Sequence, residues 1–325
     1  MFFQRYNLDL YHSKNCNANL INKINSLSFP LNEFCEVSQG YIPYDKYRGH
    51  DEFTIKNRIW HSDICKDETY KKELKGEDIK RYSLNWNGIL WVSYGKWLAA
   101  PREQKYFVNP RIIITEITRG INYKLSATFT QDEFYNTPSI INIISRNEPA
   151  ILKSILVIIN SRLMSWYHIK VNPKANAETS IPKILVNDVR NLPVSKNLIN
   201  RADHFIEKAE KMLSLNKELQ LLAQKFQRTL QRKFFSDNGF QPIAIAKKIQ
   251  NWYLLSYPDF IKELTKQKVK LSLSQEAEWE EYFTTEAKKV LALKTEIDAT
   301  DKAIDKMVYE LYGLTEEEIN ILENS

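Results

Sequence analysis

The hydrophobic and polar positions of this chain follow two different periods, and the period changes near residue 195. In the first part, short apolar runs rich in β-branched and aromatic residues are separated by turn residues, which is the pattern of strands. Four runs carry it most clearly: 88–94, 111–118, 123–130 and 139–145. The third alternates from Tyr123 to Phe129, which predicts a strand with apolar residues on one face and polar residues on the other.

Turn and helix signals connect these strands. The segment 119–122, which contains Gly120, is expected to turn the second strand into the third. Pro149 is expected to open an apolar helix that continues to about His168, followed by a polar loop over 172–183. Because strands and helices seldom alternate here, the pattern argues against a Rossmann-type sheet.

Beyond Pro193 the apolar positions step by four and three, which is the spacing of a helical seam. The first seam runs from Phe205 to Leu230 and has one polar member, Asn216, while the second runs from Trp279 to Leu311. Each predicts a helix about 45–50 Å long at 1.5 Å per residue. We expect the two helices to fold back on each other as an antiparallel coiled-coil hairpin with shorter helices between them.

The segment 304–322 predicts a sharp corner between two helices. Gly313 stands where a helix ends in the left-handed conformation, and Thr315 and Glu318 have the spacing of a capping box. Leu314 and Ile319 occupy the two positions of a hydrophobic staple. Helix termination and capping explain the whole segment.

These patterns together predict an α+β fold class, with a mixed α/β domain followed by a long two-helix hairpin. The expected regions are a lead segment over 1–30, the mixed domain over 31–198 and the hairpin over 199–325, with an insert over 239–275. A chain of 325 residues with 43% hydrophobic content is large enough for two or three cores.

The charge is distributed unevenly between these regions. Residues 1–198 contain 27 Lys and Arg against 19 Asp and Glu, whereas residues 199–325 contain 19 against 21. The excess of positive charge therefore lies in the mixed domain, which suggests that this part faces a polyanion and the hairpin faces protein.

The cysteines and the hydropathy of the chain indicate the cellular compartment in which the protein is expected. Cys16, Cys35 and Cys65 form no CxxC pair, so we expect reduced thiols and a cytoplasmic protein. The most apolar run, 151–169, is interrupted by Lys153, Asn160 and Arg162, so no membrane span and no signal peptide are expected.

Motifs of catalysis are scarce. The glycines are too widely spaced for a GxGxxG or Walker loop, and the five histidines lack metal-ligand spacing. Asp259, Glu286 and Lys288 satisfy the loose PD…ExK pattern of metal-dependent nucleases, in which carboxylates hold Mg²⁺. Glu286 and Lys288 fall inside the second predicted helix, where they would point in different directions, so helical periodicity is the simpler explanation.

Basic and aromatic residues alternate in several segments of the mixed domain. These are KYR (46–48), KNRIW (56–60), DIKRY (78–82), YGKW (94–97) and PREQKYF (101–107). Lys and Arg suit contact with phosphates, and Arg suits the bidentate reading of guanine. Half-buried strands also place aromatic and basic residues together, so nucleic-acid binding and ordinary strand packing both remain open at this level.

Several short motifs, taken in order, are similar to those of a known family. They are EVSQG (36–40), LKGEDIKRY (74–82), NPRIIITEITRG (109–120), INSRLMSWY (159–167), NDVRNLPV (187–194), WYLLSYPDFIKEL (252–264), EAEWEEYF (276–283) and IDKMVYELYGLTEEEI (304–319). With these motifs the chain resembles the C-terminal specificity region of type IIG restriction-modification enzymes. Such enzymes join a nuclease, an adenine-specific DNA methyltransferase and a TaqI-like target recognition domain in one chain.

The resemblance implies a domain that reads double-stranded DNA and a helical spacer that holds it at a distance from the methyltransferase and nuclease modules. S-adenosylmethionine and Mg²⁺ are then expected only in those catalytic modules, which would act with this chain in cis or in trans. The chain begins where the catalytic modules of the family have ended, so we expect a fragment, a truncated product or a separate specificity subunit. Residues expected to contact DNA are Arg48, Arg58, Lys80, Arg81, Lys96, Arg102, Arg119, Lys124, Lys174 and Asn176.

Two other interpretations stay open from the residues alone. One is the nuclease with Asp259, Glu286 and Lys288 as its site, and the other is an adaptor whose helices bind a protein. On the spacer, Arg228, Arg232 and Lys233 have either a phosphate-binding or a solvated role.

Overall fold

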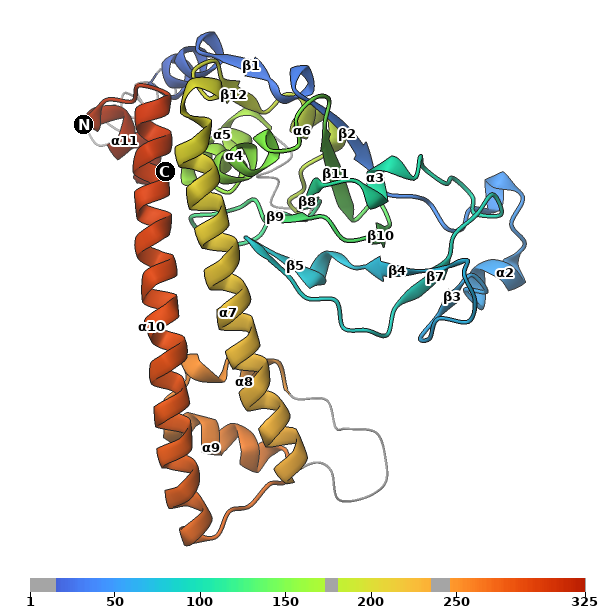
Figure 1. Cartoon of the computed structure of the whole chain (residues 1–325), viewed down its shortest axis with the longest axis vertical. Coiled ribbons are helices and arrows are strands. Elements are labelled where there is room, and N and C mark those ends of the chain that lie inside the picture. Colours follow the sequence, from blue (N-terminus) through green and yellow to red (C-terminus); the bar gives the residue numbers. More distant parts are fainter. Residues whose placement is uncertain (1–15, 173–180, 235–245, 325) are drawn as a thin grey trace, which may run out of the picture. The chain divides into compact units, whose positions relative to one another are not determined.

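The computed structural model describes residues 16–172, 181–234 and 246–324 (Figure 1). Its contacts divide the chain into two compact units. Unit 1 contains the chain up to Glu210 together with Ala303–Ser325, and unit 2 contains Lys211–Lys302. The mixture of helices and sheets confirms the predicted α+β class, whereas the domain limits 31–198 and 199–325 stay a prediction.

Unit 1 contains two four-stranded sheets, which we call sheet I and sheet II. Sheet I is antiparallel throughout and has the order β2 (Cys35–Gln39), β11 (Ile140–Ser145), β8 (Arg111–Thr115), β9 (Ala127–Thr130). Sheet II has the order β10 (Tyr135–Asn136), β4 (Tyr70–Leu74), β7 (Trp91–Ser93), β3 (His61–Ser62), and its β10–β4 pair is parallel. Two further pairs join β1 (Ser28–Pro30) to β12 (Pro193–Ser195) and β5 (Ile79–Lys80) to β6 (Ser83–Leu84).

Short helices complete unit 1. Residues 16–26 are helical, and the elements that follow are α2 (Glu52–Lys56), α3 (Lys105–Val108), α4 (Ile151–Ile159), α5 (Arg162–Val171), α6 (Val186–Arg190) and α11 (Glu316–Glu323). Two long helices, α7 (Ala202–Phe234) and α10 (Leu273–Leu311), contribute residues to both units. The short helices of unit 2 are α8 (Lys247–Gln250) and α9 (Tyr257–Lys266).

Sheet I is built around isoleucine runs. Ile112–Ile114 in β8 and the isoleucines of β11 are buried, so the strands predicted over 111–118 and 139–145 are confirmed, although the first already ends at Thr115. Successive residues point to opposite faces of a strand, so burial of consecutive isoleucines requires cover on both faces. Helix α4 packs against β8, β9 and β11, and on the other face Ile113 and Ile140 pack with Leu74 and Phe134. Each fully buried isoleucine contributes roughly 1.5–3 kcal/mol relative to exposure.

The strand predicted over 123–130 is shorter than expected. The strand begins only at Ala127, because the N–H groups of Lys124 and Leu125 bond to the Ser165 hydroxyl at 2.9 and 3.4 Å instead of to a neighbouring strand. The polar face of the strand is buried, since Thr128 is only 1% exposed. The cover on both faces of sheet I accounts for this burial.

The apolar helix predicted from Pro149 to His168 is two helices, α4 and α5. The break falls at Asn160, whose side chain accepts the N–H of Ala127 at 3.0 Å and donates to its carbonyl at 2.9 Å. Ser161 then caps α5 by accepting the N–H of Met164. These two side-chain roles compete with helix continuation, so the helix ends where the polar pair occurs.

Gly40 forms the junction between the end of β2 and sheet II. Its N–H donates to the Ile140 carbonyl at 3.3 Å, and the next N–H, of Tyr41, donates to the carbonyl of Asn136 in β10 at 3.0 Å. A Cβ on Gly40 would lie 2.0 Å from the Asn136 carbonyl oxygen, so no other residue fits. The buried Asn136 amide supports the same turn by donating to the carbonyls of Thr137 and Ile140.

Arg111 in β8 ties the segment before β10 to sheet I. Its side chain is fully buried and donates to the backbone carbonyls of Asn109, Asp132 and Phe134 at 2.9–3.1 Å. Burial lowers the pKa of Arg111 to about 10, so the guanidinium stays charged at neutral pH. A buried cation with three carbonyl acceptors fixes the approach of residues 132–134 to sheet I.

The apolar seams of the long helices are confirmed as buried faces. Phe205, Ala209 and Met212 of α7 are buried, as are Ile297 and Ile304 of α10.

No helix in the described part of the chain is long and apolar enough to cross a membrane.

In unit 2 the two long helices share one aromatic core. Phe226 of α7 stacks on Trp252 with ring centroids 3.7 Å apart and packs edge-on against Phe283 of α10. Lys211, further towards the start of α7, pairs with Glu296, further towards the end of α10, so the helices run antiparallel here. Knobs-into-holes coiled-coil packing stays a prediction.

The predicted corner near the end of the chain is confirmed. Gly313 has φ +60°, and the Thr315 hydroxyl and Glu318 carboxylate form the reciprocal bonds of a capping box. Glu318 also accepts a bond from Lys23 at 2.6 Å, so the corner fastens the helix over 16–26 in unit 1.

Replacing Gly40 with alanine should destabilise unit 1, because the new methyl group overlaps the Asn136 carbonyl. We expect a loss of at least about 2 kcal/mol, measured as a lower unfolding temperature by circular dichroism. Gly76→Ala is the matched control, since the nearest atom to its new Cβ would be 3.7 Å away. Equal unfolding temperatures for the two variants would contradict the role of this junction.

Candidate nucleic-acid interface

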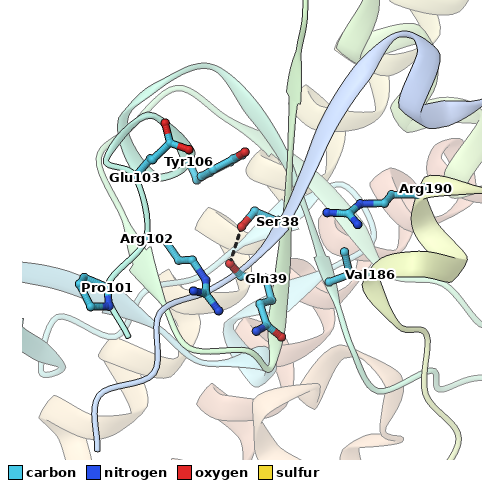
Figure 2. A pocket seen from close by; sticks show the side chains of 8 residues that line it. All are labelled: Ser38, Gln39, Pro101, Arg102, Glu103, Tyr106, Val186 and Arg190. Atoms are coloured by element: carbon cyan, nitrogen blue, oxygen red, sulfur yellow. Dashed lines mark hydrogen bonds between the residues drawn. The ribbon is translucent and has the colours of Figure 1, made fainter. Parts of the chain in front are cut away.

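A concave site of about 590 Å³ lies beside the Gly40 junction in unit 1 (Figure 2). Three elements line it: the end of β2, the segment leading into α3, and α6. Figure 2 shows the guanidinium groups of Arg102 and Arg190 on either side of Ser38 and Gln39. The lining residues are Ser38, Gln39, Pro101, Arg102, Glu103, Tyr106, Val186 and Arg190.

The fold places Arg102 at this site through backbone pairing. Ile42, two residues after Gly40, exchanges both backbone hydrogen bonds with Ala100 at 2.9 Å. The Tyr94 hydroxyl then donates to the Arg102 carbonyl at 2.6 Å and accepts the Arg102 N–H at 2.8 Å. The backbone of Arg102 is therefore held from both sides, while its side chain reaches the concave site.

The rim of the site carries an ion pair between β2 and α3. Glu36 accepts from Lys105 Nζ at 2.8 Å and from the Tyr106 hydroxyl at 2.9 Å. The hydrogen bond from Lys105, with that from Tyr106, holds the pKa of Glu36 below its ordinary value of 4.5. On the opposite side Arg190 donates to the Val37 carbonyl at 2.9 Å, which fixes α6 against β2.

Four of the ten predicted contact residues lie on two segments that the structure brings together. Arg48 and Arg58 lie in 42–58, and Lys96 and Arg102 lie in 94–102. The Ile42–Ala100 bridge and a hydrogen bond from Arg48 to the Ala99 carbonyl at 3.1 Å join these segments.

Four others form a second group around the turn after β8. Lys80 is exposed on β5, and Arg119 and Lys124 flank the turn at Gly120, which has φ +96°. The Arg81 guanidinium lies 3.8 Å from the centre of the Tyr123 ring and donates to the Asn160 carbonyl at 2.9 Å. Arg81 therefore has a packing role within unit 1.

Lys174 and Asn176 lie outside the described residues. Arg111 and Tyr82 are both buried, which gives them packing roles. Arg228 and Lys233 are exposed on α7 in unit 2.

Sequence reasoning missed Gln39 and Arg190 as site residues. Both occur in segments, EVSQG and NDVRNLPV, that were noted only for their family resemblance. They stand about 150 residues apart in the chain and meet only through the contact between β2 and α6. The signal available was their position inside those motifs.

The residues of the nuclease pattern have other partners. Asp259 is exposed at the start of α9 and bonds to Ser256 and Lys262. Glu286 is buried and pairs with Lys289 at 2.6 Å, whereas Lys288 is exposed. Within the described residues no three or more His, Cys, Asp or Glu side chains form a group that could hold a metal ion.

Comparison with known proteins identifies two regions of the chain. Residues 71–194 match the model of the TaqI-like C-terminal specificity domain, which confirms the predicted resemblance to a TaqI-like target recognition domain, while the type IIG class stays a prediction. Residues 198–308 match a domain of unknown function, DUF8810. No curated protein sequence matches the chain.

Two solved structures show weak similarity. The type IIL restriction-modification enzyme MmeI, solved in complex with DNA, is 10% identical with a TM-score of 0.34, over 81% of this chain and 36% of that one. The HsdS subunit from Thermoanaerobacter tengcongensis is 11% identical with a TM-score of 0.30, over 66% of this chain and 48% of that one. The chain thus spans less than half of either protein.

The Glu36 ion pair should make unit 1 less stable in acid. The folded-state pKa of Glu36 lies below 4.5, so the pair stabilises unit 1 above about pH 4.5, and this contribution is lost as the pH falls through the folded-state value. Glu36→Gln should therefore lower the unfolding temperature at pH 7 and have a smaller effect at pH 3. Glu148→Gln, at an exposed position without an ion pair among the described residues, is the control. An equal effect of Glu36→Gln at both pH values would contradict this role.

Proposed function

We propose that this chain is a sequence-specific double-stranded DNA recognition module of a restriction-modification system. The match of residues 71–194 to a specificity-domain model carries the proposal. The excess of positive charge in residues 1–198 supports it, since a DNA-reading surface must neutralise phosphates.

The concave site beside the Gly40 junction supplies suitable chemistry for base reading. An arginine can donate two hydrogen bonds to guanine, and a glutamine amide can pair with adenine, both in the major groove. Arg102 and Gln39 offer these two groups from one site, and Arg190 adds a second cation. Phosphate contacts from Arg48, Arg58, Lys96, Lys80, Arg119 and Lys124, with Lys174 and Asn176, complete the proposed interface.

The identity of the catalytic partner is a further part of this proposal. The chain would position an adenine-specific methyltransferase, with its nuclease, in cis as in type IIG enzymes or in trans as a separate subunit. S-adenosylmethionine and Mg²⁺ would bind to those modules. The long helices α7 and α10 are suited to a spacer role because each extends beyond 30 residues. A partner methyltransferase that modifies the same site without this chain would contradict the arrangement.

The purified chain should select a short duplex motif from random oligonucleotides. Its affinity for that duplex should fall with salt, with a logarithmic slope of about −0.9 for each phosphate contacted. Absence of both a preferred motif and salt-dependent binding in the folded chain would overturn the proposed function.

Arg102→Ala should weaken binding to the selected duplex by about 1–3 kcal/mol and relax the choice of base at one position. Fluorescence anisotropy on a panel of single-base variants of the duplex measures both effects. Lys270→Ala, at an exposed lysine of unit 2, is the control and should bind as the unchanged chain does. A uniform loss over all base variants would assign Arg102 to a phosphate instead of a base.

A further inference from the structure

Two aromatic side chains project from a small helical segment of unit 1. Tyr47 is 86% exposed in a short 3₁₀ helix, Lys46–Arg48, and Phe53 is 71% exposed in α2. Neither helix has a buried residue. Large aromatic side chains with this exposure contribute to no core, so both rings are accessible to a partner.

The segment is held firmly although it is peripheral. Arg48 donates to the Ala99 carbonyl, and His50 Nε2 lies 2.9 Å from the Trp97 carbonyl, which can only accept. The Tyr44 hydroxyl accepts the Trp60 N–H at 3.0 Å at the other end of the segment. Because the backbone that carries the exposed rings is already fixed, binding a partner through them costs less conformational entropy.

Basic residues occur close to the two aromatic residues in the chain. Lys46 Nζ lies 4.8 Å from the centre of the Tyr47 ring, and Lys56 and Arg58 follow Phe53 within five residues. Among the described residues, no hydrogen bond or ion pair involves the side chain of Lys56 or Arg58. Arg58 also has φ +49°, a left-handed conformation that a bulky residue seldom adopts.

The acidic residues of the segment are used internally. Asp45 accepts the Tyr47 N–H and Asp51 accepts the Thr54 N–H, each at the start of a helix. The bond from Thr54 lowers the pKa of Asp51, as expected for a capping carboxylate. Glu52 lies in the first turn of α2, where the helix N-terminus favours negative charge. The lysines and Arg58 thus remain available to an external anion.

We infer that Tyr47 and Phe53 form an apolar contact with the bases of duplex DNA, while Lys46, Lys56 and Arg58 hold the flanking phosphates. This inference rests on the proposed function and adds to it base contacts by residues that do not line the concave site, while Arg58 is shared with the phosphate contacts proposed above. Aromatic side chains contact bases by stacking on them or by packing against the thymine methyl group. Either contact brings the protein close to the charged phosphates of the flanking nucleotides, which nearby cations neutralise.

The test uses the full chain and a duplex selected by it from random oligonucleotides. Tyr47→Ala and Phe53→Ala should each weaken binding at least about fivefold, with little change in the salt slope, because no charge is removed. Lys56→Ala should instead lower the magnitude of the salt slope by about 1. Ile199→Ala is the control, since Ile199 is an exposed apolar side chain of unit 1 outside this surface. All four side chains are exposed, so the variants should keep the unfolding temperature of the unchanged chain.

A second measurement detects the base contact directly. With 2-aminopurine placed at successive positions of the selected duplex, the unchanged chain should alter the fluorescence at one or two positions, and Phe53→Ala should abolish the change. Unchanged affinity and fluorescence in both aromatic variants would overturn the inference while leaving the proposed function intact, and would indicate a surface for a protein. A chain that binds no duplex would overturn the proposed function and this inference with it.

Discussion

The close approach of Gly40 to the carbonyl of Asn136 is the constraint on which the rest of unit 1 depends. It lets the chain leave β2 of sheet I and pair at once with the strand ends of sheet II, at a distance that excludes any side chain. Arg111 fastens the other crossing between the sheets by donating to the carbonyls of Asp132 and Phe134 before β10. The first crossing uses backbone atoms alone, and the second depends on the single side chain of Arg111.

The candidate interface follows from this junction. Gln39 stands immediately before Gly40, and the pairing of Ile42 with Ala100 brings Arg102 to the same place. Tyr94 then holds the backbone of Arg102 without using its guanidinium. A site arranged in this way can change its reading side chains while the supporting backbone stays fixed, which suits a domain whose task is specificity.

The sequence predicted the features that depend on local rules. The isoleucine strands, the buried seams of α7 and α10, and the capping box at Thr315 all follow from periodicity and spacing, and the structure confirms them. The break at Asn160 could not be predicted, because the helix pattern continues through it and its cause is a hydrogen bond to Ala127, 33 residues away. The sequence also could not predict that Gln39 and Arg190 line one site, since this depends on packing between elements that are distant in the chain. Basic and aromatic alternation marked Arg48, Arg58 and Arg102 as candidate DNA contacts, which stay a prediction, and it could not separate the exposed Tyr47 from the buried Tyr82.

Hydrogen–deuterium exchange of the full chain, with and without a selected duplex, tests most directly whether the region around the Gly40 junction reads DNA. Binding should slow exchange in 36–40 and 101–106, which supply the concave site, and leave α9 of unit 2 unchanged. Protection confined to unit 2, or no protection at a saturating concentration of the duplex, would contradict the proposed interface.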